Sequence, residues 1–199
     1  RRENPVQRLG TCRCRAHEAR PSFVEFCLRH LAASSPGPSG MVYATLGSGE
    51  LYHDWELLEG LRLRGCRVAA VHAVDAAYRR SAAEAGRNHR SALQTLAAWL
   101  AADGVPLRAY DDVDALEEAA GASAHVLMHS DAPACTGGLP RLGRLLRPGA
   151  LYLHMAQGTG SLFEAWRRPC LAGEEPSVEL ELLERRAWPG EGPEETVHT

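Results

Sequence analysis

The sequence predicts an α/β fold, a doubly wound and mostly parallel sheet of about six or seven strands with helices on both faces. Short apolar runs alternate with segments whose apolar residues recur at helical spacing, and this alternation is typical of successive βαβ units. A glycine-containing turn follows the first strand, and aspartates follow later strands. Because parallel sheets are buried on both faces, apolar strands of this kind are expected in them.

The first βαβ unit spans residues 41–75. Met41–Leu46 is a short, mostly apolar strand between two glycines, and the next helix begins near Glu50. Apolar residues recur along that helix at Leu51, Trp55, Leu58 and Leu61. The acidic residues Glu50, Asp54, Glu56 and Glu59 are expected on its other faces. Gly65 ends the helix, Val68–Val74 forms the second strand, and Asp75 stands at its carboxyl end.

The same alternation continues to the end of the chain. Further helices are expected over residues 91–102, 114–120 and 139–146. Further strands are expected over residues 105–110, 125–129, 150–155 and 178–188, and residues 196–199 would begin a last strand.

The turn Gly47-Ser48-Gly49 is the strongest chemical signal. Glycine permits positive φ and lets a ligand approach the backbone, and the free N–H groups of the following helix suit an anionic group. Asp75 could accept hydrogen bonds from both hydroxyls of a ribose. Each feature also has an ordinary explanation, because such turns are common and aspartate at a strand end is often a turn former.

Residues 41 to about 188 resemble a class I S-adenosylmethionine-dependent methyltransferase domain in the order of these elements. The segment RLLRPGALYLH, residues 144–154, resembles the helix end, turn and strand that precede that family's later strands. The resemblance implies S-adenosylmethionine as cofactor, with the turn of Gly47, Ser48 and Gly49 near its methionine part and Asp75 on its ribose. It also implies Asp111 or Asp112 near the adenine, and Ser130 and Asp131 near the methyl group and the substrate.

Some residues depart from the family pattern. The loop's third glycine is replaced by Leu51, and Gly47 and Asp75 are 28 positions apart, against about 20 in the related dinucleotide fingerprint. The segment after residue 129 lacks the Pro-Pro-aromatic motif of amino-group methylases, which disfavours DNA amines and protein glutamine as acceptors. Only one strand of the family's final antiparallel pair, residues 178–188, is evident, so a truncated chain is expected.

His129, Asp131 and His154 are the candidate catalytic residues, because they stand at strand ends and can accept a proton from an acceptor. A histidine in such a place is more often a hydrogen-bonded structural residue. Asp111 and Asp112 could likewise cap the helix that follows them.

Three functions remain open on the sequence. The first is methyl transfer from S-adenosylmethionine to an unidentified acceptor. The second is a methyltransferase-like domain that has lost catalysis and serves as a binding or scaffold module. The third is an NAD(P)-dependent oxidoreductase. Tyr52 argues against it, because the GxGxxG motif of such enzymes requires its last glycine at that position.

The amino-acid composition and the net charge argue against several classes of protein. The 199 residues carry a formal net charge of −3, and all 22 basic residues are arginine, so nucleic acid is not supported as a partner. No apolar run approaches the roughly 20 residues of a membrane span, and no secretory signal is evident. A cytoplasmic protein with reduced cysteines is therefore expected, with no indication of oligomeric state.

The chain is expected to divide into three parts. Residues 1–40 form a basic arm, a short helix from residue 21 to 33 and a Ser/Pro/Gly linker; residues 41–188 form the methyltransferase-like domain; residues 189–199 are flexible or truncated. The arm's metal-ligating residues are Cys12, Cys14, His17, Cys27 and His30. Their spacing matches no common zinc site, so no metal is expected.

Overall fold

The computed structural model describes residues 19–34, 39–78, 87–130, 138–156, 162–170 and 178–187. In chain order its elements are α1 (Ala19–Ala33), β1 (Met41–Leu46), α2 (Tyr52–Leu63), β2 (Val68–Val74), a 3₁₀ turn η1 (Ala76–Tyr78), α3 (Arg87–Ala101), β3 (Leu107–Tyr110), α4 (Val113–Ala120), β4 (Ala124–Ser130), α5 (Leu139–Leu145), β5 (Leu146–Ala156), β6 (Leu162–Arg167) and β7 (Glu181–Ala187).

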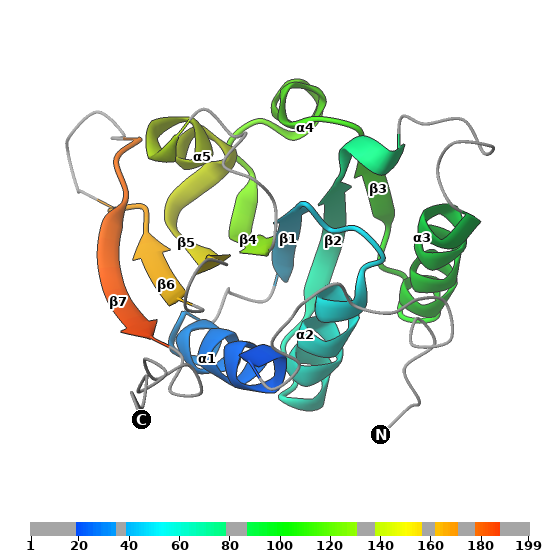
Figure 1. The fold of residues 1–199 in the computed structure, drawn as a ribbon, viewed down its shortest axis with the longest axis horizontal. Coiled ribbons are helices and arrows are strands. Elements are labelled where there is room, and N and C mark those ends of the chain that lie inside the picture. Colours follow the sequence, from blue (N-terminus) through cyan, green and yellow to red (C-terminus); the bar gives the residue numbers. More distant parts are fainter. Residues whose placement is uncertain are drawn as a thin grey trace, which may run out of the picture.

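The strands form one seven-stranded sheet in the order β3-β2-β1-β4-β5-β6-β7 (Figure 1). Strands β1 to β5 are parallel, β6 is antiparallel to β5, and β7 is antiparallel to β6. The predicted doubly wound, mostly parallel α/β fold is confirmed. The chain reverses its direction of winding between β1 and β4, and in such sheets ligands bind outside the carboxyl ends of the strands at that point.

The final antiparallel pair corrects the sequence-based expectation. Its first member is β6, which was not predicted, and its second is β7, which was. Strands β6 and β7 pair with each other within residues 162–187, so the expectation of an incomplete final pair is wrong. Strand β6 carries a buried glutamate between apolar residues, and this broke the apolar pattern on which the prediction relied. Residues 196–199 lie outside the described residues.

The Arg-Pro-Gly segment is a bulge inside β5 and not the separate turn that was expected. Ala124 pairs with Leu146 and Val126 with Leu151, so four residues of β5 lie opposite one residue of β4. Gly149 has φ 81°, which this path requires and glycine adopts without strain.

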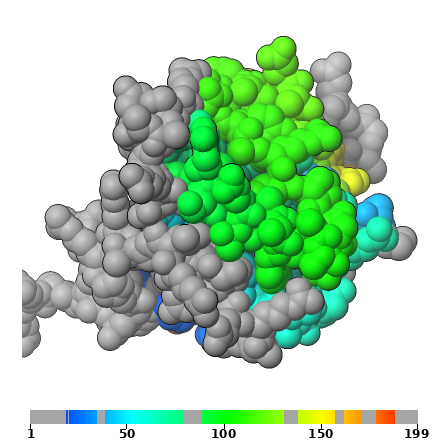
Figure 2. Space-filling model, turned by 90° about the vertical axis from the view of Figure 1, so that its right-hand side faces the viewer, coloured from blue at the N-terminus to red at the C-terminus, as the bar shows by residue number. Residues whose placement is uncertain are grey.

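Two hydrophobic layers sandwich the sheet. Helices α1, α2 and α3 cover one face, and α4 and α5 cover the other. Successive side chains of each strand point alternately into the two layers. In β4, Val126 and Met128 pack in the first layer and Leu127 packs in the second. The two layers explain why the central strands are apolar on both sides. Figure 2 shows the side of the molecule near β3, where the coloured atoms of α3 and α4 dominate the surface.

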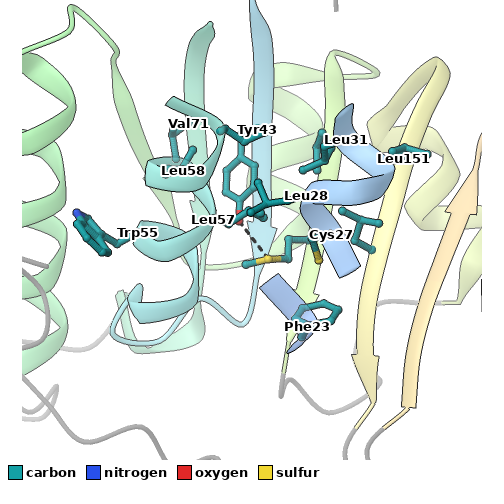
Figure 3. Close-up of a cluster of buried hydrophobic side chains, with 14 of the residues drawn as sticks. Phe23, Cys27, Leu28, Leu31, Tyr43, Trp55, Leu57, Leu58, Val71 and Leu151 are labelled. Carbon is teal, nitrogen blue, oxygen red and sulfur yellow. Dashed lines mark hydrogen bonds between the residues drawn. The ribbon is translucent and has the colours of Figure 1, made fainter. Parts of the chain in front are cut away.

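Helix α1 belongs to the first of these layers. Phe23, Cys27 and Leu31 are fully buried, and Figure 3 shows them facing the side chains of α2 and the sheet. The proposed division of the chain at residue 40 stays a prediction. Residues 1–18 and 188–199 lie outside the described residues.

Helix α2 is buried on nearly all its faces, which the sequence did not indicate. Asp54 and Glu59, expected on polar faces, are each 1% exposed. The hydroxyl of Tyr43 donates to Asp54 Oδ1 over 2.8 Å, and Arg62 pairs with Glu59 through two hydrogen bonds. Each buried carboxylate thus has a hydrogen-bonding partner, which burial of a charge requires.

A buried arginine holds the end of α5. Arg168 is 4% exposed, and its Nη1 donates to the carbonyl of Gly143 over 3.2 Å and to the carbonyl of Leu146. The cationic side chain therefore satisfies carbonyl groups left open where α5 passes into β5. Among the described residues, no helix is long and apolar enough to cross a membrane.

Candidate functional site

The glycine turn adopts a run of left-handed backbone conformations at the carboxyl end of β1. Gly47 has φ 66°, Gly49 has φ 49°, and Leu51 has φ 60°. The N–H groups of Gly47 and Ser48 both donate to the carbonyl of Val74, at 2.9 and 3.3 Å, which ties the turn to the end of β2.

Leu51 explains how the turn keeps this path without a third glycine. A left-handed conformation costs an ordinary residue about 1–2 kcal/mol. The side chain of Leu51 is 0% exposed and lies in the first hydrophobic layer. Full burial of a leucine contributes about 1.5–3 kcal/mol, which offsets the strain. The side chain therefore packs in the core below the turn.

Asp75 is directly bonded to the turn. Its Oδ2 accepts from the N–H of Gly49 over 2.7 Å, and its Oδ1 accepts from the N–H of Ala77 over 2.7 Å. An ionised carboxylate has about four acceptor positions, so capacity remains for two hydroxyl donors. A Cβ placed on Gly49 would lie 4.0 Å from Asp75 Oδ2, an ordinary contact, so it is the φ of 49° and not a lack of space that favours glycine here.

Tyr78 joins the turn from η1 and was missed in the sequence. Its hydroxyl lies 2.8 Å from Ser48 Oγ and donates to the carbonyl of Gly49 over 3.3 Å. Burial raises the pKa of this phenol far above its usual value, and the hydrogen bond with Ser48 only partly opposes that effect. Tyr78 therefore remains a neutral hydrogen-bonding group. Its position three residues after Asp75 was the available signal.

The two aspartates expected near the adenine have different surroundings. Asp112 is the N-cap of α4, because its side chain accepts from the N–H of Ala115 over 2.8 Å. The capping alternative for Asp112 is thus confirmed. Asp111 directly follows β3, beside Tyr110, whose carbonyl accepts from the N–H of Asp75 over 3.1 Å. Its predicted contact with a cofactor stays a prediction.

A second polar cluster lies near the carboxyl ends of β4 and β5. His129 and His154 are register partners whose rings stack with centroids 4.9 Å apart. Nδ1 of His129 lies 2.9 Å from the hydroxyl of Tyr152. His129 is only 3% exposed, whereas the side chain of His154 is 23% exposed. Of the two candidate bases, His154 is therefore the more accessible to a substrate.

Glu164, on β6, completes the cluster and was not predicted. Its Oε2 lies 3.2 Å from Nδ1 of His154, and its Oε1 accepts from Nε of Arg185 over 2.7 Å. Burial alone would raise the pKa of Glu164, but the hydrogen bonds from His154 and Arg185 outweigh burial and lower it. The ionised carboxylate favours a proton on Nδ1 of His154 and leaves Nε2 as the acceptor.

A buried carboxyl group lies in the first turn of α2, just beyond the glycine turn. Burial raises the pKa of Asp54 to about 6, and the hydrogen bond from Tyr43 opposes this only in part. Asp54 is 1% exposed, so it is a structural group beneath the turn and not a direct contact for a ligand.

The structure describes only some of the remaining candidate site residues. Ser130 ends β4 and is 5% exposed. Asp131 lies outside the described residues, as do the loops over residues 131–137 and 157–161. Cys27 is fully buried, and His30 contacts Glu184 at 3.0 Å. Within the described part of the chain, no group of three or more metal-ligating side chains occurs.

Comparisons with known proteins give similarities of fold. No protein-family profile and no curated protein sequence matches the chain. Among solved structures, a Plasmodium falciparum protein provisionally named a protein-L-isoaspartate O-methyltransferase, in complex with S-adenosyl-L-homocysteine, matches 82% of this chain and 70% of its own. Its sequence identity is 12% and its TM-score 0.48.

Two further solved structures also match. The methyltransferase domain of the citrinin polyketide synthase has 16% identity and a TM-score of 0.46 over 67% of this chain, and the CurJ carbon methyltransferase has 12% and 0.48 over 70%. This chain spans about a third of the length of each, 34% and 35%. These similarities are low in sequence identity and concern the fold alone.

Proposed function

We propose that this protein binds S-adenosylmethionine and transfers its methyl group to an acceptor that must lose a proton. The observation that carries the proposal is the turn at Gly47–Leu51, held by Asp75 at the point where the sheet reverses its winding. A left-handed non-glycine residue is strained, and such strain in natural proteins concentrates at functional sites.

The residues around the turn fit the cofactor. Gly47 and Gly49 offer backbone without side chains, and no side-chain cap occupies the N-terminus of α2. Asp75 retains acceptor positions for ribose hydroxyls. The bound cofactor supplies a methyl group activated by its sulfonium.

We assign the proton-accepting role to His154. Its Nδ1 is hydrogen-bonded to Glu164, so its Nε2 can take a proton from an acceptor that approaches the carboxyl edge of β4 and β5. Arg185 holds Glu164 from β7, so Glu164 acts as a positioning residue. A carboxylate acceptor is already deprotonated at neutral pH and would need no such base.

The first test is ligand binding by titration calorimetry with S-adenosylmethionine, S-adenosylhomocysteine and NAD. We expect saturable binding of the first two, weakened at least about tenfold in Asp75→Ala because hydrogen bonds to a charged group are lost. Asp112→Ala is the matched control, since Asp112 also follows a strand but caps α4. Its affinity should remain within about twofold of the wild type.

The outcomes separate the candidate functions. Binding of NAD alone would identify a nicotinamide-dependent protein. Absence of binding by all three compounds would leave a scaffold role. Equal weakening in Asp75→Ala and Asp112→Ala would show that the loss comes from general disturbance of the sheet edge.

The second test measures transfer of a tritiated methyl group to a panel of phenols, amines, thiols and carboxylates. His154→Gln should lower the rate about 100-fold, and Glu164→Gln about tenfold, without a change in cofactor affinity. His72→Gln is the control, because His72 is hydrogen-bonded to Tyr110 on the same face but far along the sheet order. Full activity of His154→Gln would remove this residue from the mechanism.

A further inference from the structure

A small cavity lies at the edge of the sheet opposite to the glycine turn, where the parallel strands begin. It holds about 90 Å³, is partly open to solvent, and is lined by the end of α1, the start of β1, the start of β4 and the bulge of β5. A single water needs roughly 10–15 Å³ on this measure, so a group larger than one water fits. None of the described residues that line it is acidic.

The bulge gives this cavity its polar wall. Residues 147–150 bow out opposite His125, because the register passes directly from Ala124–Leu146 to Val126–Leu151. Bulges redirect side chains, and here Nη1 of Arg147 comes to 2.7 Å from Nε2 of His125. Ser34 lines the cavity from the end of α1.

The hydrogen bonds of His125 leave two donors facing each other. The backbone N–H of Val42 donates to Nδ1 of His125 over 3.1 Å. A neutral imidazole has one N–H, so the proton is on Nε2, and that N–H points at the guanidinium of Arg147. Protonation of the ring would add a second donor and not an acceptor. In either state the Arg147–His125 contact needs an acceptor that neither side chain supplies.

The charge of the site favours an anionic acceptor. Burial lowers the pKa of His125, and the charge of Arg147 lowers it further. The ring is therefore neutral at pH 7, with the tautomer set by Val42. An oxygen with negative charge can accept from both N–H groups and offset the charge of Arg147.

We propose that this cavity binds a small oxyanion, a phosphate or carboxylate group, that accepts from both Nε2–H of His125 and the guanidinium of Arg147. The site is separate from the glycine turn and does not depend on the proposed methyl transfer. Binding here would brace the bulge of β5 against β4 and the end of α1.

The test is an NMR titration of the full chain with inorganic phosphate, and separately with acetate, in a chloride buffer of constant ionic strength. We expect saturable shifts of the ring nitrogens of His125 and the side chain of Arg147, and a raised pKa of His125 when the anion is bound. His125→Asn keeps an acceptor for Val42 but removes the Nε2 donor. It and Arg147→Gln should each weaken binding about tenfold or more.

Arg186→Gln, which removes an exposed arginine on β7, is the matched control and should bind as the wild type does. Saturation by phosphate alone would identify a phosphate site, and saturation by acetate alone a carboxylate site. Shifts that grow linearly with either salt, or that are the same in all variants, would overturn the proposal.

Discussion

Replacing Asp54 by asparagine should raise the free energy of unfolding at pH 8 by on the order of 3 kcal/mol. Burial raises the pKa of Asp54 from 3.8 in the unfolded chain to about 6 in the folded protein. Asparagine has nearly the same shape and can still accept from the hydroxyl of Tyr43, but it carries no charge to desolvate.

The size of this effect depends on pH. Well below pH 3.8 Asp54 is protonated in both the folded and the unfolded chain, so it contributes no penalty. Between about pH 4 and 6 the unfolded chain loses the proton first, and the wild type loses stability as pH rises. Above pH 6 the penalty is constant. The advantage of Asp54→Asn should therefore appear between pH 4 and 6 and persist above it.

Urea unfolding at pH 4, 5, 6 and 8 measures this difference. The control is Asp103→Asn, which changes an exposed aspartate and should give a difference near zero at every pH. A variant that is less stable than the wild type at pH 8 would show that the charged carboxylate is net stabilising, through its bond with Tyr43.

Replacing Gly143 by alanine should lower the free energy of unfolding by on the order of 3 kcal/mol. A Cβ on Gly143 would lie 1.8 Å from the carbonyl oxygen of Val178 and 2.8 Å from its carbonyl carbon. These are backbone atoms, so no rotamer change relieves the overlap. The segment that leads into β7 would have to move away from α5, which outweighs the roughly 1 kcal/mol that alanine gains in a helix.

Gly60 provides the matched control, because it also lies in a buried helix. A Cβ there would meet Cδ1 of Leu28 at 2.7 Å, and that methyl group is at the end of a flexible side chain. Gly60→Ala should therefore cost clearly less than Gly143→Ala. Thermal unfolding of the two variants should show a decrease of about 6–12 °C for Gly143→Ala. Equal decreases would contradict the account.

The carboxyl-edge site could be located from the sequence only in part. Gly47, Gly49 and Asp75 are linked by local order, a strand, a turn, a helix and a second strand, and such patterns depend on neighbouring residues. The bond between Gly49 and Asp75 agrees with that interpretation. Glu164 could not be singled out, because its significance comes from partners that other elements supply. For Tyr78 the sequence offered only its position three residues after Asp75, and its contacts with the turn come from the fold.

Residue polarity alone also gave a wrong prediction of which faces of α2 are exposed. Asp54 and Glu59 were expected at the surface, because acidic side chains are seldom fully buried. Both are nonetheless buried in the folded protein, where Tyr43 and Arg62 supply their hydrogen bonds. The bond from Tyr43 joins β1 to α2, and no local pattern indicates it. Arg62 is only three residues from Glu59, but a charge pair at that spacing is ordinary on an exposed helix face and does not reveal burial.

The sequence by itself determined the order of strands and helices up to β5, the mostly parallel character of the sheet and the place of the glycine turn, because these follow from periodicity and from the conformational freedom of glycine. Only the tertiary structure decided that β6 lies beside β5, that His129 stacks on His154, and that the Arg147–Ala150 bulge faces His125. Each of these depends on contacts between different elements of the fold, and the local pattern of one element does not indicate its partner in another.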